Sequence, residues 1–163
     1  MKLWPLAPTL LLCLATAALG DPAAPTIHVS GAVLHPHDWT ETELRQRPAT
    51  TETVFFHTGH GVLSGSFKGV LLWSLLQDAG IRTDPANKND LLRHSVSVTG
   101  TDGYSVTLSV GEIDPEHGGD QAILAFEKDG AALAPKEGFS RLIIPCDKAA
   151  GRAVSAIASI EVK

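Results

Sequence analysis

Residues 67–81 read FKGVLLWSLLQDAGI, and this stretch carries the clearest structural signal in the chain. From Val70 onward the apolar residues recur at helical spacing, at positions 70, 72, 73, 75, 76 and 79. Gly80 follows the last of them, and glycine commonly ends a helix because it adopts the left-handed conformation without a Cβ clash. The pattern predicts a helix from Val70 to Ala79.

The segments before this helix read as two strands separated by a short helix. Residues 27–34 and the β-branched, aromatic segment 51–56 are typical of strands. Between them Thr40 is a suitable N-cap residue, and Leu44 lies on the apolar side of the helix that follows. Residues 57–65 hold three glycines, so we expect a loop there.

The segment after the helix is dominated by strands. Residues 100–103 predict the turn of a hairpin, and Asp129-Gly130 is a strong signal for a tight turn. We expect strands at residues 94–99, 104–108, 122–127, 140–145 and 153–162. Many strands interrupted by a few short helices indicate a single α+β domain.

The start of the chain has the parts of a secretory signal peptide. Lys2 gives a positive beginning, residues 6–19 are apolar and uncharged, and small residues allow a signal peptidase to cut after Gly20. A retained membrane anchor is the alternative, but the uncharged run is shorter than the roughly 20 residues that a span requires. We therefore expect a signal peptide at residues 1–20, export to the periplasm, and one mature domain over residues 21–163.

The composition argues against several classes of partner. The chain has 18 acidic and 13 basic residues and a formal net charge of −5, and its basic residues do not cluster. Nucleic acid is therefore not an expected partner, because it requires a basic patch. Cys13 would leave with the signal peptide, so Cys146 remains alone and no disulfide is expected within the mature domain. We expect Cys146 to be a structural residue.

Several stretches, in order along the chain, are similar to one protein family. Residues 67–81 match its G-V-x-L-x-x-L-L-x-x-A-G-I element, and the Asp-Gly-Tyr of residues 102–104 matches the next element. GFSRLIIP at residues 138–145 matches a G-x-x-R-L-x-x-P element, and residues 152–160 match the closing strand. From residue 27 to residue 162 the chain resembles the sulfite oxidase fold, the oxidoreductase molybdopterin-binding domain. The resemblance implies a single α+β domain with mixed β-sheets and a few short helices.

The chain departs from this family at one position that matters for chemistry. The enzymes of the family bind molybdenum through a cysteine on the loop after the second strand. Here that loop reads FHTGHG at residues 56–61 and has no cysteine. A thiolate is a soft anionic ligand that fixes the metal and tunes its potential, and neither Thr58 nor a neutral imidazole replaces it. The resemblance therefore implies a small exported protein that binds a free, non-metallated pterin.

In that subset of the family the protein acts as a ligand sensor. The expected partner is the periplasmic part of a membrane-bound signalling protein, either one that controls cyclic-dinucleotide turnover or a kinase. We expect no catalytic residues, since the chain has neither a serine nucleophile elbow nor a Walker lysine at the right spacing. Two alternatives stay open: a molybdenum-cofactor oxidoreductase that binds molybdopterin with a non-cysteine metal environment, and a partner-binding module that has lost its ligand.

A pterin ring has a hydrogen-bonding edge from which a carboxylate can accept two bonds. Asp102, Glu112 and Asp147 are the candidate carboxylates, and we favour Asp147 and Asp102. The alternative for Asp102 is that its side chain shapes its own turn. Tyr104 and Phe139 are candidates for stacking on the ring, although core packing is the better explanation for Phe139.

Arg141 resembles the family arginine that steadies the pterin or its phosphate. An arginine within an apolar strand is expected to have a ligand or a buried acid as its partner, and Ser140 beside it adds a donor. Glycine lets the backbone come close to a ligand, so further pterin contacts are expected from the loop residues His57, Thr58, Gly59 and His60. The spacing of the histidines matches no metal-binding motif, so we expect no metal site.

Overall fold

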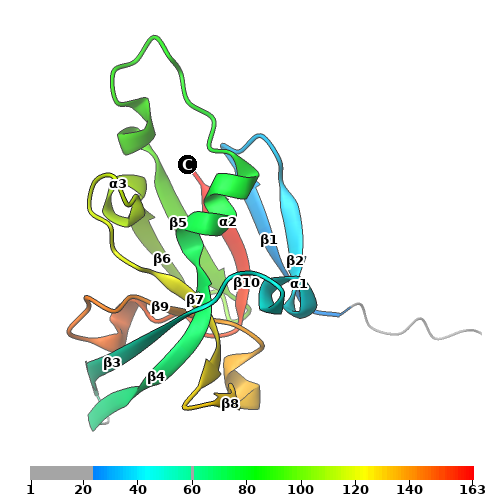
Figure 1. Cartoon of the computed structure of the whole chain (residues 1–163), viewed down its shortest axis with the longest axis vertical. Helices are drawn as coiled ribbons and strands as arrows, with labels where there is room; N and C mark the ends of the chain where they lie inside the picture. The colour runs from blue at the N-terminus through cyan, green and yellow to red at the C-terminus, as the bar shows by residue number, and fades with distance from the viewer. Residues whose placement is uncertain (1–23, 60) are drawn as a thin grey trace, which may run out of the picture.

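The computed structural model describes residues 24–59 and 61–163, which form two five-stranded sheets with short helices beside them (Figure 1). In the first sheet the strand order is β2-β1-β10-β5-β6. Its strands are β1 (Thr26–Gly31), β2 (His37–Thr40), β5 (Ser95–Gly100), β6 (Ser105–Ser109) and β10 (Ile157–Val162). The β1–β10 pair is parallel and the other neighbours are antiparallel, so the sheet is mixed.

The second sheet has the order β3-β4-β7-β8, and β9 pairs with β7 on the same side as β8. Its strands are β3 (Thr50–Thr58), β4 (Gly61–Leu71), β7 (Ile123–Lys128), β8 (Ala131–Ala132) and β9 (Arg141–Ile143). All of its pairs are antiparallel. The two sheets and their short helices form the α+β domain that the sequence predicts.

The helical segments are short. They are α1 (Glu41–Arg45), α2 (Leu72–Ala79), α3 (Val110–Ile113) and the 3₁₀ turns η1 (Asp90–Arg93), η2 (Pro135–Glu137) and η3 (Ala150–Arg152). Within the described part of the chain, none of the helices has the length and apolar character needed to cross a membrane.

The core lies on both faces of the second sheet. Along β7 the side chains alternate, so that Leu124 and Phe126 belong to the large core shared with α2 and the first sheet, while Ile123 and Ala125 belong to a smaller core under β3. Strand β9 alternates in the same way, with Leu142 in the large core and Ile143 in the small one. A strand buried on both faces reads as a continuous apolar run, and this explains the sequence of β7.

The helix predicted from Val70 begins later, at Leu72. Val70 and Leu71 are the last residues of β4 and pair with Leu124 and Ile123 of β7. The helical spacing extends into the strand because Val70 contributes to the same core as the helix. The predicted end is confirmed, since Gly80 caps the helix at φ 65°.

The loop predicted over residues 57–65 is wrong, because the described residues of this segment, apart from Gly59, belong to the two strands of a β-hairpin. Strands β3 and β4 pair in unbroken register from Thr50↔Gly69 to Thr58↔Gly61. The glycines were read as loop signals, but Gly61 and Gly65 lie within β4. Alternation of buried and exposed residues along β3, with Val54 and Phe56 buried, holds the hairpin against the small core. Strand β3 ends at Thr58 and β4 begins at Gly61.

Strands β4 and β7 come unusually close at Gly69. The pairing of the two strands shifts register between Lys68 and Gly69, and Gly69 is buried. A Cβ at this position would meet the carbonyl oxygen of Leu124 and lie 2.5 Å from the Cα of Ala125. The glycine of the G-V-x-L element is therefore required by backbone contact between strands.

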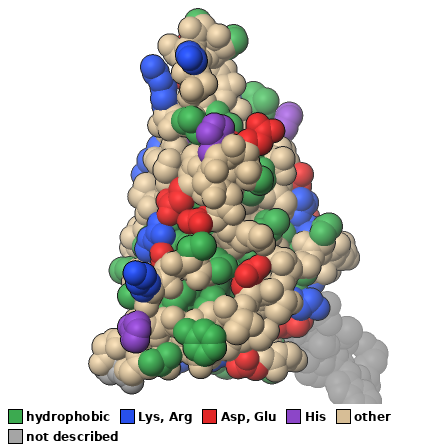
Figure 2. All heavy atoms as spheres, turned by 60° about the vertical axis from the view of Figure 1, so that its left-hand side comes forward, with side chains coloured by type: hydrophobic (Ala, Val, Ile, Leu, Met, Phe, Trp, Pro, Cys, Tyr) green, Lys and Arg blue, Asp and Glu red, His purple; other side chains and the backbone are tan. Residues whose placement is uncertain are grey.

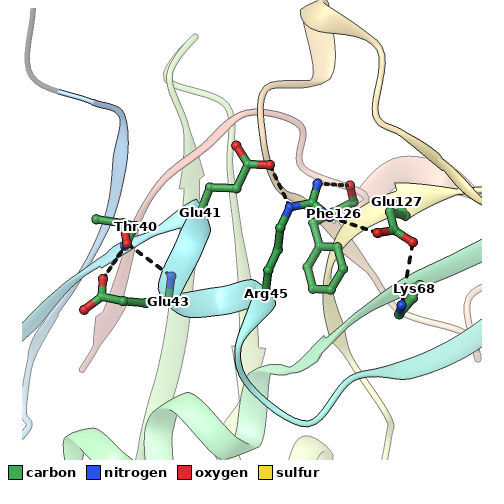
Figure 3. Close-up of polar contacts among 7 residues, drawn as sticks. All are labelled: Thr40, Glu41, Glu43, Arg45, Lys68, Phe126 and Glu127. Carbon is green, nitrogen blue, oxygen red and sulfur yellow. Dashed lines mark hydrogen bonds and ion pairs between the residues drawn. The ribbon is translucent and has the colours of Figure 1, made fainter.

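Helix α1 is fixed at both ends by polar contacts (Figure 3). At its start the Glu43 amide donates to Thr40 Oγ1 at 3.2 Å, and the Thr40 amide donates to Glu43 Oε2 at 2.8 Å, which makes a capping box. At its end Arg45 donates to Glu127 Oε1 at 2.9 Å and to the Phe126 carbonyl at 3.2 Å. Thr40 is thus confirmed as the N-cap, and α1 is tied to the end of β7.

Replacement of Gly69 by alanine is expected to destabilise the protein by about 1–3 kcal/mol or more, because the two strand backbones must separate to admit a Cβ. Gly151→Ala is the matched control, since a Cβ there meets nothing within 4 Å. Urea denaturation of both variants measures the effect. Equal midpoints for Gly69→Ala and the parent protein would contradict the close approach.

Candidate functional site

An open pocket of about 560 Å³ lies at one end of the second sheet. Its lining comes from the free end of the β3–β4 hairpin, the last residue of β7, η2, the first residue of β9 and the segment before β10. The lining residues are Thr58, Val62, Leu63, Lys128, Lys136, Glu137, Arg141 and Ser155. Figure 1 shows the hairpin and β8, which precedes η2, at the same end of the molecule. A volume of this size is typical of sites for small molecules.

Arg141 enters this pocket with one strong partner. Its Nη1 forms an ion pair with Glu137 Oε1, and both side chains are mostly buried, with 13% and 14% of their surfaces exposed. The Nε of Arg141 is buried and has no hydrogen-bond partner. The predicted buried acid is therefore Glu137, and the arginine still has an unsatisfied donor.

Ser140 is completely buried, and its Oγ also has no hydrogen-bond partner. The serine is adjacent in sequence to Arg141, the first residue of β9. Unsatisfied buried polar atoms are uncommon and are costly in a folded protein, so they mark places where a ligand or water supplies the missing bond. Two such atoms lie on consecutive residues, of which Arg141 lines the pocket and Ser140 does not.

The remaining charges of the pocket are positive. Lys128 lies with its Nζ 5.6 Å from the ring centre of Phe67, which supports the ammonium by a cation–π contact. Lys136 is exposed on η2. Besides these two lysines and Arg141, the pocket lining has one carboxylate, Glu137. The chain as a whole has a net charge of −5. The pocket is a local basic site on an acidic protein.

Thr58 is the last residue of β3 and is exposed at the mouth of the pocket. Its Oγ1 donates to the Gly61 carbonyl at 2.9 Å, across the end of the hairpin. Gly59 has open space where a Cβ would be. His60, also predicted as a pterin contact, lies outside the described residues.

The segment from Asp147 to Arg152 is held from three sides. The amide of His57 donates to the Lys148 carbonyl at 2.9 Å, and the hydroxyl of Tyr104 donates to the Gly151 carbonyl at 2.5 Å. These bonds connect the segment to β3 and to the residue that precedes β6. We call residues 147–152 the latch segment.

The third contact of the latch segment is made by Arg152, whose guanidinium pairs with two carboxylates. Its Nε and Nη2 donate to the two carboxylate oxygens of Asp147 at 3.0 and 2.6 Å, and Nη1 donates to Glu112 Oε1 at 2.7 Å. The hydrogen bonds that Arg152 donates to Asp147 and Glu112 raise the pKa of Arg152 above its ordinary value. Figure 2 turns the side that carries β3 and α3 forward and shows acidic and basic side chains next to one another on it.

Two other predicted residues have local structural roles. The Asp102 Oδ1 accepts the amide of Tyr104 at 2.9 Å, so this carboxylate shapes its own turn, as the alternative reading holds. Phe139 is half-buried and packs against the large core. It borders a separate depression of about 250 Å³ near Arg45 and Phe126.

Cys146 is exposed and does not line the pocket. A hydrogen bond to Asp120 and the negative charge of Asp120 raise the pKa of the Cys146 thiol, and burial and Asp147 act in the same direction. The thiolate that a soft metal needs is therefore disfavoured. Within residues 24–59 and 61–163, no group of three His, Cys, Asp or Glu side chains is placed to hold a metal ion.

The structure thus separates several of the predicted site residues. Thr58 and Arg141 line the pocket, whereas His57 and Tyr104 bond to the latch segment, to which Asp147 belongs. The sequence reading missed Lys128 and Lys136. The signal for Lys128 was its place at the end of a buried strand beside a tight turn, but no local pattern marks Lys136.

A family model for the oxidoreductase molybdopterin binding domain matches residues 16–163. Among solved structures, the chain is similar to the sulfane dehydrogenase SoxCD from Paracoccus pantotrophus, with a TM-score of 0.68 and 21% sequence identity. The similarity covers 85% of this chain but 38% of that one, so it shows a shared fold. No curated protein matches the chain. The family match and the shared fold confirm the resemblance to the sulfite oxidase fold.

The raised pKa of Cys146 predicts slow alkylation by iodoacetamide near pH 8, because little thiolate is present. Removal of the Asp120 charge in Asp120→Asn is expected to lower the pKa and speed the reaction several-fold. Glu161→Gln is the control, since Glu161 pairs with Lys163. Mass spectrometry over time gives the rates, and an unchanged rate in Asp120→Asn would refute the assignment.

Proposed function

This chain belongs to the oxidoreductase molybdopterin binding domain family, and on that premise we propose that it is an exported pterin-binding protein without a thiolate-held metal. In this proposal it acts as a periplasmic ligand sensor for a membrane signalling partner and has no catalytic residues. The pterin occupies the pocket between the β3–β4 hairpin and Arg141.

The observation that carries the proposal is the absence of a cysteine from residues 56–61, the segment that resembles the cysteine loop of the family. In the enzymes of this family a cysteine on that loop binds molybdenum, whereas this segment has Thr58 at the mouth of the pocket. Its hydroxyl is a hard, neutral group that donates to the Gly61 carbonyl. A hydroxyl of this kind does not supply the charge or the softness that a thiolate gives to molybdenum.

A thiolate-bound molybdenum does not fit the other described residues either. Cys146 lies outside the pocket, and its raised pKa disfavours the thiolate. The pocket-lining carboxylate, Glu137, is committed through one oxygen to Arg141 and through the other to the Ala134 amide, which donates at 3.2 Å.

The pocket fits an organic pterin in several respects. The side chains of Val62 and Leu63 supply apolar surface for the ring system. The guanidinium of Arg141, which lines the pocket, has N–H donors of the kind that a ring carbonyl or ring nitrogen accepts. Pterins carry both types of acceptor, so Arg141 supports this ligand class.

The sensor part of the proposal rests on the contacts of the hairpin. His57, next to Thr58 in β3, joins the hairpin to the latch segment, and that segment is bonded to Tyr104 and Glu112. A ligand that moves the end of the hairpin thus acts on a bonded network that reaches α3 and the start of β6. This arrangement supports transmission of ligand binding to the surface, where a partner can respond.

The first test is chemical. The mature chain, purified from the periplasm of a pterin-producing host, is expected to release one fluorescent pterin per protein on denaturation and only traces of molybdenum. Mass spectrometry identifies the pterin, and elemental analysis measures the metal. Stoichiometric molybdenum together with a pyranopterin would overturn the proposal and favour the molybdenum-cofactor oxidoreductase.

The sensor role has a cellular readout. Deletion of the chain is expected to change the cyclic-dinucleotide level in cells that make pterins, and blocking pterin synthesis should abolish that difference. Nucleotide extraction and mass spectrometry measure the level in all four combinations. A deletion effect that persists without pterins would contradict ligand sensing.

A further inference from the structure

We propose that a groove around Trp73, between α2, η1 and the loop after α3, docks a segment of the signalling partner that is both basic and apolar. The inference deepens the sensor part of the proposed function and rests on it, because it names the surface at which the partner is recognised. It is carried by three connected depressions, by the acids at one end of them, and by their link to the latch segment.

The three depressions meet at Trp73, a half-buried residue near the start of α2. The first, of about 320 Å³, is lined mainly by apolar side chains of α2 and η1. The second and third, of about 340 and 170 Å³, lie toward the loop after α3. The first two share Gln77 and Leu91, and the last two share Pro115, so the depressions form one groove. We call it the Trp73 groove.

The two ends of the Trp73 groove differ in chemistry. At the η1 end Ile81 and Leu91 supply apolar surface, whereas the other end is lined by Asp114, Glu116 and Asp120. Among the described residues, those that line the three depressions include no lysine or arginine. An occupant that matches both ends therefore carries apolar side chains next to positive ones. Tryptophan is enriched among the residues that dominate binding at protein interfaces, which favours a protein segment as the occupant.

The acids at this end are charged, and one of them is unused. The oxygens of Asp114 accept the Glu116 amide at 3.0 Å and pair with His117 Nδ1 at 2.8 Å. The bond from the Glu116 amide, followed by the contact with His117, lowers the pKa of Asp114 below its ordinary value. Glu116 is exposed, and within the described part of the chain its carboxylate has no Lys, Arg or His partner. Its charge is available to a basic side chain of the partner.

The acidic loop is held in one conformation by backbone contacts. The amides of Gly118 and Asp120 donate to the carbonyls of Gly111 and Glu112, at 2.9 and 3.0 Å. Gly118 comes so close to α3 that a Cβ on it would lie 2.5 Å from the Glu112 carbonyl oxygen. A surface that is fixed before binding loses little conformational entropy when a partner docks. The loop therefore presents its acids in a fixed arrangement.

The groove is connected to the latch segment through Glu112. Arg152 of the latch segment donates to Glu112 Oε1 at 2.7 Å, and the Glu112 carbonyl accepts the Asp120 amide at 3.0 Å. Figure 1 shows α2 and α3 in the upper half of the view and the free end of the β3–β4 hairpin at the bottom, so the groove and the pterin pocket lie at different ends of the molecule. The bonded network of the proposed sensor leads from the pocket to the Trp73 groove.

The test uses three synthetic peptides of equal length, without aromatic residues, on the mature chain. In the first peptide leucine alternates with arginine, in the second glutamate replaces arginine, and in the third serine replaces leucine. We expect the Kd of the leucine–arginine peptide to be about tenfold lower than that of either other peptide at low salt. At high salt the difference from the leucine–glutamate peptide should shrink.

Calorimetry measures the Kd values, and tryptophan fluorescence reports on the place of binding. Once Trp4 has left with the predicted signal peptide, the chain keeps Trp39 and Trp73. Trp39 is buried in the core, whereas Trp73 is half-buried in the groove. The leucine–arginine peptide is therefore expected to change the fluorescence of Trp73.

Two variants at exposed positions assign the effect to the groove. Glu116→Lys reverses the unused charge, and Gln77→Arg adds a long cationic side chain on α2, where arginine is a good helix former. Each is expected to raise the Kd of the leucine–arginine peptide about tenfold, because like charges then meet. Glu161→Lys is the matched control, with the same charge reversal at an exposed position of β10 that lines none of the depressions.

The same variants connect the groove to signalling. All three are expected to stay folded in thermal melts and to release one pterin per protein, because none of these positions lines the pterin pocket. In cells, Glu116→Lys should abolish the effect of the chain on the cyclic-dinucleotide level, whereas Glu161→Lys should retain it. A full cellular effect in a Glu116→Lys protein that no longer binds the peptide would overturn the inference.

The outcomes of the peptide test separate the two proposals. Equal Kd values for the three peptides, a preference for the leucine–glutamate peptide, or no binding would overturn this inference. A preference that survives in Glu116→Lys and in Gln77→Arg would place binding elsewhere and would overturn it too. Pterin release without peptide binding would leave the proposed ligand intact. Peptide preference in a protein that releases no pterin would overturn the proposed function, and the groove would remain a docking site without a sensor role.

Discussion

The close approach of β4 and β7 at Gly69 is the constraint on which the rest of the structure depends. Strand β4 carries the apolar wall of the pocket at Val62 and Leu63, and β7 ends at Lys128. Because no side chain separates the two backbones at Gly69, the strands lie close together there, at the point where their pairing shifts register. Helix α2 follows β4 directly and contributes to the large core.

Much of the fold could be predicted from the sequence, and the failures have a common cause. Capping at Thr40, the helix end at Gly80 and the turn at Asp129-Gly130 are local effects of particular residues, and the structure contains all three. The β3–β4 hairpin was missed because its glycines are locally typical of loops. Pairing with the neighbouring strand decides their conformation. The residue pattern of a single segment carries no information about that neighbour.

The site was predictable to a smaller extent, for the same reason. An arginine at the start of an apolar strand required a buried acid, and Glu137 supplies it four residues earlier. The role of Asp102 in its own turn was also one of the alternatives that the sequence left open. By contrast, Lys128 and Lys136 come together with Thr58 only through the order of the strands. No motif describes a cluster assembled from separate elements.

Residue 58 has a consequence for how such a domain can change over evolutionary time. It lies at the exposed end of β3, and its backbone pairing with Gly61 does not depend on which side chain it bears. The backbone of the hairpin end can therefore stay as it is while the side chain at residue 58, which lines the pocket, varies. A lineage can change the lining of the pocket mouth there by one substitution, with the scaffold unchanged.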